Sequence, residues 1–250
     1  MLERDRVLSP ILGDLHARLD DVEVEAETEP AGAARGRPFV TLAYAQSLDG
    51  SIAGQGGRPL SLSGPSSLQL THELRAAHDA ILVGIGTVLS DDPQLNVRLV
   101  PGSDPQPIVV DSRLRVPDAS HLMESGRGTW LAATEDASEQ EEERARARGV
   151  EVLRTPALEN GWVDLDALVA GLAKRGVSRL LVEGGARILT SFLKARLVDY
   201  VVITVSPQFV GGVPALCETE LSPFPRLRSW QTERVGEDLI MAGELAWPDS

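Results

Sequence analysis

A glutamate and two glycines stand where an apolar run gives way to a helical pattern. The run Arg179–Val182 leads into Glu183, Gly184 and Gly185, and a helical pattern then spans Ala186–Ala195. Glycines at such a junction let backbone N–H groups approach an anion, and the positive end of a helix favours a phosphate there. Two glycines can also form a plain turn, but the neighbouring carboxylate needs a partner. We therefore predict an anion-binding turn beside a carboxylate.

A second glycine-rich turn follows another apolar run. Gly84 and Gly86 permit a close backbone approach, and Thr87 places a hydroxyl at the start of the next helical pattern. The spacing is not that of the dinucleotide-binding fingerprint, because Leu89 stands where its third glycine would be. Asp91 ends this stretch, and by spacing alone it is typical of a capped turn.

Polar side chains also follow two other strand patterns. Ser112 and Arg113, with Arg115 close behind, offer a hydroxyl and two guanidinium groups that suit a ribose 2′-phosphate, although loop arginines are also ordinary surface residues. Ser47 and Asp49 follow the first strand and either orient a ligand or satisfy the N–H groups of a turn.

Side chains for metal or nucleophilic chemistry are sparse. The four histidines, none at a metal-binding spacing, are His16, His72, His78 and His121. The single cysteine, Cys217, excludes a disulfide framework and multi-cysteine zinc sites. The sequence also lacks a G-x-S-x-G elbow and a Walker loop. We expect no metal, and an organic cofactor that carries the chemistry.

The overall charge narrows the classes of partner. The 250-residue chain has a formal net charge of −13, which excludes a general nucleic-acid binder because phosphate neutralisation needs a basic face. No apolar run approaches the roughly 20 residues of a membrane helix, and the N-terminus lacks the apolar segment of a signal peptide. We expect a cytoplasmic protein without nucleic-acid or membrane partners. Its anionic ligands must be held by local arginines or N–H groups.

Strand and helix patterns alternate from Phe39 onward. Strands are expected at 39–45, 80–83, 107–111, 129–133, 150–153, 179–182 and 198–205, helices at 65–78, 135–148, 164–174 and 186–195, and two more strands within 230–247. This alternation indicates an α/β domain around a largely parallel sheet. Ligands of such sheets bind at the carboxyl ends of the strands, where the turns described above lie.

The first 37 residues have a different character. Leu8, Ile11, Leu12, Leu15 and Leu19 recur at helical spacing, an acidic run follows at 20–29, and a Pro/Gly/Ala-rich stretch covers 30–38. We divide the chain into an acidic N-terminal extension and linker, 1–37, and a main domain, 38–250. The extension is expected to pack on its own domain or on a second subunit rather than to take part in catalysis.

Taken in order, these turns resemble the reductase family of riboflavin biosynthesis, which includes the C-terminal half of the bifunctional pyrimidine deaminase–reductase. The resemblance runs from about Phe39 to about Glu244. Its motifs are Ser47–Gly50, Leu74–Ala76, Asp79–Gly84, Thr87–Val88, Asp91–Leu95 with Arg98, Pro107–Asp111, Val182–Gly185, Leu197–Asp199, and Ser206–Pro207 followed by Gly211–Gly212. It implies a reductase domain with a dihydrofolate-reductase-like three-layer fold, antiparallel C-terminal strands on a mostly parallel sheet, and a homodimer.

The same resemblance implies an activity and a set of site residues. The reaction would be the NADPH-dependent reduction of 5-amino-6-(5-phosphoribosylamino)uracil, or its diaminopyrimidinone analogue, to the ribitylamino compound. Asp49 or Glu183 would supply a proton. The cofactor would contact Ala45, Ser61, Gly84, Thr87, Asp91, Ser112, Arg113, Gly184, Gly185, Ala186, Arg187 and Ile188. The substrate would contact Ser47, Arg75, Leu95, Arg98 and Glu183.

Two stretches depart from the family pattern. Ser51 stands where many relatives carry a basic residue, and Ser61–Ser63 replaces a Trp-Ile-Thr stretch. Two rival functions therefore stay open, a dihydrofolate or pterin reductase on the same fold and a non-catalytic NADPH-binding protein. A pterin site would use a carboxylate but would not need Arg75 and Arg98 together. The sequence contains no zinc-binding cysteine pair, so we expect no deaminase activity.

Overall fold

The structure, a computed structural model, describes residues 9–28, 36–217 and 221–248. Its elements in chain order are α1 (Pro10–Thr28), β1 (Phe39–Ser47), β2 (Ser51–Ala53), the 3-10 helix η1 (Gln55–Gly57), α2 (Pro65–Ala76), β3 (Ala80–Gly84), α3 (Ile85–Asp91), β4 (Gln106–Val110), α4 (His121–Glu124), β5 (Trp130–Thr134), α5 (Glu139–Arg146), β6 (Glu151–Thr155), α6 (Leu165–Ala173), β7 (Arg179–Val182), α7 (Ala186–Lys194), β8 (Tyr200–Ser206), β9 (Val213–Pro214), β10 (Arg226–Val235) and β11 (Asp238–Ala246).

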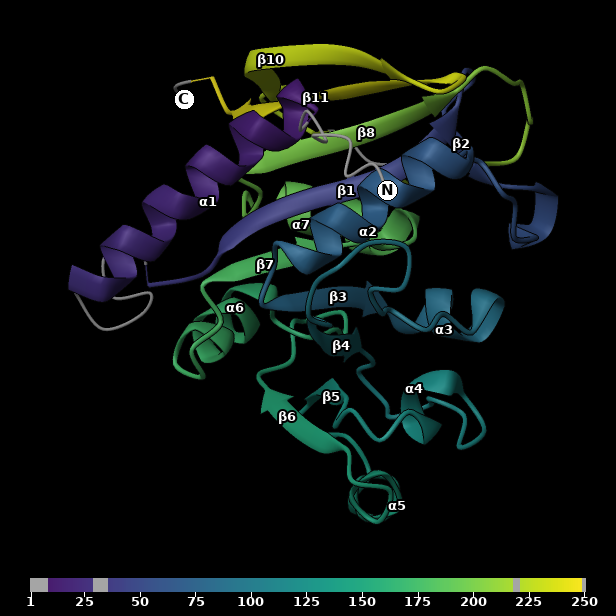
Figure 1. Cartoon of the computed structure of the whole chain (residues 1–250). Helices are drawn as coiled ribbons and strands as arrows, with labels where there is room; N and C mark the ends of the chain where they lie inside the picture. The colour runs from purple at the N-terminus through teal and green to yellow at the C-terminus, as the bar shows by residue number, and fades with distance from the viewer. Residues whose placement is uncertain (1–8, 29–35, 218–220, 249–250) are drawn as a thin grey trace, which may run out of the picture.

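Nine of the described strands form one twisted sheet in the order β10-β11-β8-β1-β7-β3-β4-β5-β6 (Figure 1). Neighbours from β8 through β6 run parallel, whereas β11 pairs antiparallel with both β8 and β10. The expected α/β fold, with a mostly parallel sheet and antiparallel C-terminal strands, is confirmed. The remaining described strands, β2 and β9, make a small separate pair.

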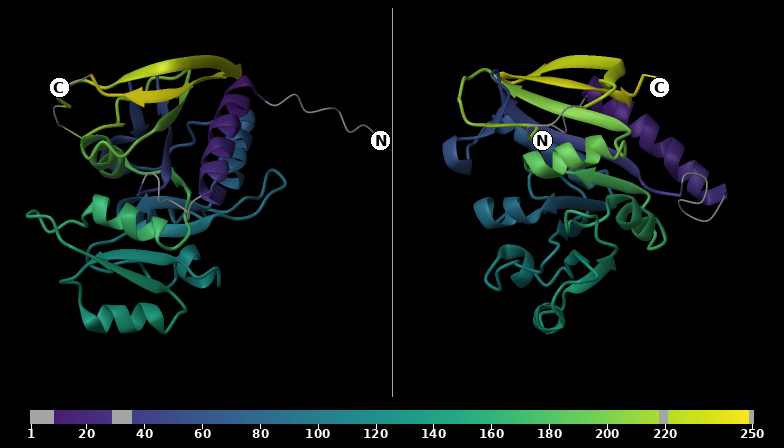
Figure 2. Two further views of the ribbon diagram at one scale, coloured as in Figure 1. Left: turned by 90° about the vertical axis from the view of Figure 1, so that its left-hand side faces the viewer. Right: turned by 180° about the vertical axis from the view of Figure 1, so that it is seen from behind.

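The sheet is covered on both faces, which makes the main domain three layers thick. The central strands are apolar runs, and every residue of β3 is buried, as parallel strands between helices require. One apolar core joins the sheet to α1, α2, α4 and α5, and a second joins it to α6 and α7. Figure 2 shows the sheet nearly edge-on, with α1 and α2 on one side and the green helices on the other.

Several boundaries differ from the sequence expectation. The short helix α4 was not predicted, because 4 residues are too few to display a helical period. Of α3, the sequence analysis expected only a helix start at Thr87, and the helix begins at Ile85. The strand β10 begins at Arg226, ahead of the expected 230–247 region, and α5 is shorter than the expected helix at 135–148.

No helix of the described residues has both the length and the apolar character needed to cross a bilayer.

The helix α1 is longer than expected and belongs to the core. It continues through the acidic run to Thr28, and Ile11, Leu12, Leu15 and Leu19 are at most 1% exposed. The Tyr200 hydroxyl on β8 donates to Asp14 at 2.9 Å, and the Arg18 guanidinium lies 5.5 Å from the Tyr200 ring centre. Burial, helped by Asp14, raises the pKa of Tyr200 above its usual value. The extension therefore packs on its own domain; Leu8 and residues 29–35 lie outside the described residues.

A buried histidine just after α2 joins this helix to β1. The two ring nitrogens of His78 lie 2.6 Å from the Leu74 carbonyl oxygen and 2.8 Å from the Thr41 hydroxyl of β1. Burial lowers the pKa of His78 to about 4, so the ring is neutral at physiological pH. This contact fixes the C-terminal end of α2, the last turn of which carries Arg75.

We expect Leu15→Ala to lower the free energy of unfolding by about 2–5 kcal/mol, because it removes a fully buried leucine from the α1 interface. Urea denaturation measures the change. The control is Asp20→Ala on the exposed side of the same helix, which should shift stability by less than about 0.5 kcal/mol. Equal stability of Leu15→Ala and the control would mean that α1 does not unfold with the main domain.

Candidate active site

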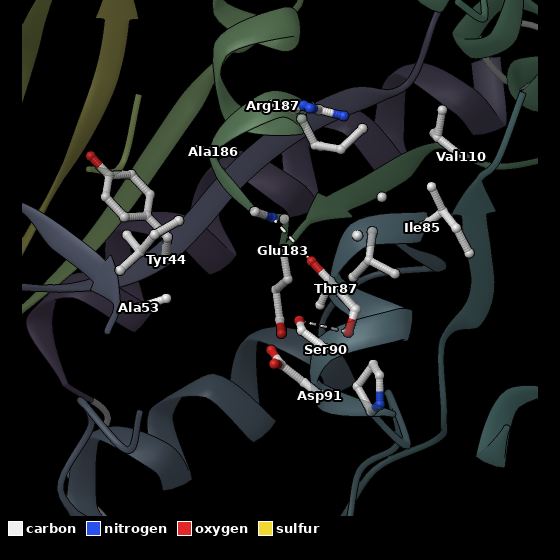
Figure 3. Close-up of a pocket in the computed structure, with 18 of the residues that line it drawn as sticks. Tyr44, Ala53, Ile85, Thr87, Ser90, Asp91, Val110, Glu183, Ala186 and Arg187 are labelled. Carbon is white, nitrogen blue, oxygen red and sulfur yellow. Dashed lines mark hydrogen bonds between the residues drawn. The ribbon is translucent and has the colours of Figure 1, made fainter. Parts of the chain in front are cut away.

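A cleft opens at the carboxyl edge of the sheet (Figure 3). Its volume is about 1330 Å³, and it is lined at the ends of four strands by Ala45, Gly84, Val110 and Glu183. These positions belong to β1, β3, β4 and the turn after β7, so the predicted turns meet at one edge of the sheet, as the parallel topology requires.

Most of the residues singled out from the sequence line this cleft. They are Ala45, Ser61, Arg75, Gly84, Thr87, Asp91, Leu95, Ser112, Glu183, Gly184, Gly185, Ala186, Arg187 and Ile188. Four others do not line it, namely Ser47, Asp49, Arg98 and Arg113. Arg98 and Arg113 are exposed outside the cleft, whereas Ser47 is buried under the first turn.

One end of the cleft is organised by an ion pair between α2 and the turn after β7. Arg75 Nε and Nη2 donate to the two carboxylate oxygens of Glu183 at 2.9 and 2.7 Å. Burial opposes the charge of Arg75, but Glu183 outweighs it and raises the pKa of the guanidinium. Glu183, the carboxylate that we expected to need a partner, is therefore paired with Arg75. A salt bridge is the simplest role for an arginine on a helix surface. This fork geometry holds both side chains in fixed orientations.

A short loop containing Leu95 and Arg98 packs against this ion pair. Leu95 is 2% exposed and has a positive φ of 48°, a strained conformation for a branched residue. Arg75 Nη1 donates to the Asn96 carbonyl oxygen at 3.1 Å, and the Arg98 N–H donates to His72 Nδ1 at 3.1 Å. Burial, together with the charges of Arg75 and Arg98, lowers the pKa of His72 and keeps this nitrogen free to accept. The loop is thus bound to α2 at two points.

A residue that the sequence analysis missed supports the same loop from its other side. Arg127 donates to the carbonyl oxygens of Gln94 and Leu95, the latter at 3.2 Å. It also pairs with Asp104 at 3.5 Å, and Asp104 accepts a hydrogen bond from the Val97 N–H at 2.7 Å. Arg127 lies in an irregular segment before β5, where no motif signals a role.

Asp49 is engaged in a turn rather than in the cleft. Its carboxylate accepts hydrogen bonds from the Ser47 hydroxyl at 2.5 Å, from the N–H groups of Val210 and Gly211 at 2.9 and 2.7 Å, and from the Ser51 hydroxyl at 3.0 Å. These bonds, that from Ser47 foremost, hold the pKa of Asp49 well below its usual range. Asp49 is therefore ionised at neutral pH. It ties the first turn to the segment after β8.

The glycine turns form a cradle at the start of α7. The Gly185 N–H donates to the Thr87 hydroxyl at 3.2 Å, and no side chain caps the first turn of α7. A Cβ on Gly84 or Gly184 would come within 2.6 or 2.7 Å of Ile188, so these glycines let the two turns approach. Gly184, Gly185 and Ala186 at this helix terminus line the cleft, and the N–H groups of a first helical turn suit the pyrophosphate of a dinucleotide.

Two cations lie farther along the cleft from Glu183. Figure 3 shows Arg187 on the opposite side of the cradle from the Glu183 carboxylate, on the side of Val110. The Arg187 guanidinium makes no ion pair within the described part of the chain. Arg115, rather than Arg113, lines the cleft beside Ser112, and its Nε donates to Asp111 at 3.1 Å. The arrangement provides charge for a second phosphate, with Arg115 in the place predicted for Arg113.

Other lining residues had no signal in the sequence. The aromatic ring of Tyr44 lines the cleft from β1, and burial raises the pKa of its phenol. A hairpin between β6 and α6 contributes Leu158 and Trp162. Neither position belongs to a motif, because a side chain in a long connection carries no period that reveals its direction.

Comparisons with known proteins place these features in a family. A family model described as the RibD C-terminal domain matches residues 38–241. The chain is 37% identical over 221 residues to a 2,5-diamino-6-ribosylamino-4(3H)-pyrimidinone 5′-phosphate reductase of Archaeoglobus fulgidus, covering 84% of this chain and 99% of that protein.

Solved structures of similar fold lead to the same family. A RibD of Acinetobacter baumannii has a TM-score of 0.77 at 25% identity, with 95% of this chain and 64% of that chain covered. The riboflavin biosynthesis reductase Rib7 of Saccharomyces cerevisiae has a TM-score of 0.68 at 27% identity, with 93% and 100% covered. This chain therefore spans less than two thirds of the RibD chain and the whole of the yeast protein.

We expect Glu183→Gln to lower the free energy of unfolding by about 2 kcal/mol, because it leaves the Arg75 guanidinium without its counter-charge. The loss should fall below the ~3–5 kcal/mol of a fully buried pair, since both side chains keep some contact with water. Chemical denaturation measures it. The matched control is Glu124→Gln on the exposed side of α4, and a loss no larger than the control's would contradict the expectation.

Proposed function

The chain belongs to the RibD C-terminal domain family, and on that premise we propose that it reduces 5-amino-6-(5-phosphoribosylamino)uracil, or its diaminopyrimidinone analogue, with NADPH. The observation that carries the proposal is the continuity of one cleft. A cradle for a dinucleotide and an arginine–carboxylate pair for a polar substrate lie side by side in it. The archaeal relative, almost all of which is covered by the match, is named for this substrate class.

The cofactor end fits NADPH. The N–H groups at the start of α7 would hold the pyrophosphate, with Thr87 supporting Gly185. Arg187, Arg115 and the Ser112 hydroxyl would hold the 2′-phosphate that distinguishes NADPH from NADH. When bound, NADPH supplies a hydride.

The substrate end offers different groups for the sugar and for its phosphate. Glu183 neutralises the charge of Arg75, so this pair suits hydroxyl and amino groups of the ribosylamino part. Arg98 stands outside the cleft on the adjoining loop, and among the described residues its guanidinium donates only to the Asn96 side chain, at 2.8 Å. We assign the sugar phosphate to Arg98.

The reduction requires a carbon–nitrogen double bond. Opening of the sugar ring would give an imine, whose carbon would take the hydride that NADPH supplies and whose nitrogen would take a proton. Of the two carboxylates offered by the sequence, Glu183 lines the cleft, whereas Asp49 holds the first turn. We propose that Glu183 accepts a hydrogen bond from the opened sugar and holds it beside the cradle, so that proximity supplies most of the acceleration. Of the two proton sources expected from the sequence, Glu183 is the one that lines the cleft.

The natural compartment and assembly in this proposal are the cytoplasm and a homodimer. A dimer is supported by large apolar side chains left on the surface away from the cleft, among them Phe209, 81% exposed, and Leu239, 43% exposed. Light scattering should give about twice the 26.8 kDa of one chain. A mass of one chain at micromolar concentration would contradict the homodimer and leave the activity untouched.

The activity is tested by fluorescence titration with NADPH and NADH, followed by NADPH oxidation with three substrates. These are the phosphoribosylamino pyrimidine, its dephosphorylated form and dihydrofolate. We expect tighter binding of NADPH and turnover of the phosphorylated pyrimidine above the other two. Turnover of dihydrofolate alone would transfer the site to a pterin. Binding of NADPH without oxidation on any substrate would indicate a non-catalytic binding protein, and no binding at all would remove the reductase proposal.

A further inference from the structure

A hydrogen-bonded hairpin with an apolar tip lines the cleft, and no part of the cofactor or substrate is assigned to it above. We call residues 157–163 the Trp162 hairpin. Ala157 bridges Val163, the Leu158 N–H donates to the Trp162 carbonyl oxygen at 2.8 Å, and the Gly161 N–H donates to the Leu158 carbonyl oxygen at 2.8 Å. The Asn160 side chain accepts from the Trp162 N–H at 3.0 Å. These bonds connect the two sides of the tip.

The tip exposes apolar surface that nothing in the described chain covers. Leu158 and Trp162 are each 46% exposed, and both line the cleft. Holding large apolar side chains against water is unfavourable, so a fixed pair of them inside a cleft indicates a ligand with an apolar face. Half-exposed tryptophan offers a flat ring for stacking.

We infer that the Trp162 hairpin is the platform on which the adenine ring of NADPH stacks. This inference rests on the proposed function, because it assigns one part of that cofactor. Glu183 and Arg187 lie on opposite sides of the cradle, so a dinucleotide with its nicotinamide near Glu183 directs its adenosine past Arg187. The Trp162 hairpin is the apolar, aromatic part of the remaining lining.

Charge beside the hairpin agrees with a neutral base. Asp164 and Asp166, at the start of α6, line the cleft and follow Trp162 closely in sequence; Asp164 also caps α6, where its Oδ1 accepts from the Ala167 N–H at 3.0 Å. Carboxylates disfavour a phosphate at this position, whereas they accept hydrogen bonds from an amino group such as that of adenine. The 2′-phosphate then falls to Arg187, Arg115 and Ser112.

The test separates the two ends of the cofactor. Adenosine 2′,5′-bisphosphate carries the adenine and no nicotinamide, and reduced nicotinamide mononucleotide carries the nicotinamide and no adenine. Isothermal titration calorimetry compares both with NADPH on the wild-type chain, Trp162→Ala, Trp162→Phe and the control Trp230→Ala. Trp230 is 57% exposed on β10 and does not line the cleft.

We expect Trp162→Ala to weaken NADPH and adenosine 2′,5′-bisphosphate about tenfold, as loss of one base–aromatic stack does, with reduced nicotinamide mononucleotide unchanged. Trp162→Phe should keep most of the affinity, and Trp230→Ala all of it. Unchanged binding of adenosine 2′,5′-bisphosphate to Trp162→Ala would overturn the inference while the proposed function stands. Failure of the wild-type chain to bind NADPH would overturn both.

Discussion

The ion pair between Arg75 and Glu183 joins two layers of the molecule at the end of the cleft that we propose for the substrate. Arg75 reaches from α2, which His78 fastens to β1, and Glu183 directly follows β7 at the centre of the sheet. The third donor of Arg75 holds the loop that carries Leu95. One guanidinium thus sets the distance between a helix, a strand end and a loop, and the cleft depends on all three.

The excess of acidic residues explains why most arginines are paired with carboxylates and only a few are left to bind phosphates. With a net charge of −13, most arginines of the described residues are matched by carboxylates, including Arg75 by Glu183, Arg127 by Asp104 and Arg115 by Asp111. Arg187, which lines the cleft, and Arg98, which stands outside it, are exceptions. Selectivity for phosphates then comes from a few unmatched guanidinium groups and from helix N–H groups rather than from a basic surface.

The sheet and most of the cleft were predictable because their signals are local. Buried parallel strands are continuous apolar runs, and Gly184 and Gly185 follow one of them directly. Side-chain direction beyond a strand end was not predictable. Leu114, with a positive φ of 56°, redirects the chain so that Arg115 rather than Arg113 enters the cleft. Likewise, Asp49 and Arg98 belong to motifs of the site, but neither side chain lines the cleft. The Asp49 carboxylate is bonded to the segment after β8, and the Arg98 guanidinium is bonded to Asn96. The Trp162 hairpin and α4 were too short or too irregular to show a period.

The position of α1 has a consequence for the order in which the chain acquires its structure. Its core contacts join residues near the start of the sequence to β8, β10 and β11, and the hydrogen bond between Asp14 and Tyr200 spans 186 positions. During synthesis α1 therefore emerges long before the strands that bury its leucines have been made. Contacts between residues so far apart in sequence slow folding. They also leave the apolar face of α1 exposed until the C-terminal strands have been synthesised. The last hairpin, β10–β11, completes the surface that the first helix needs.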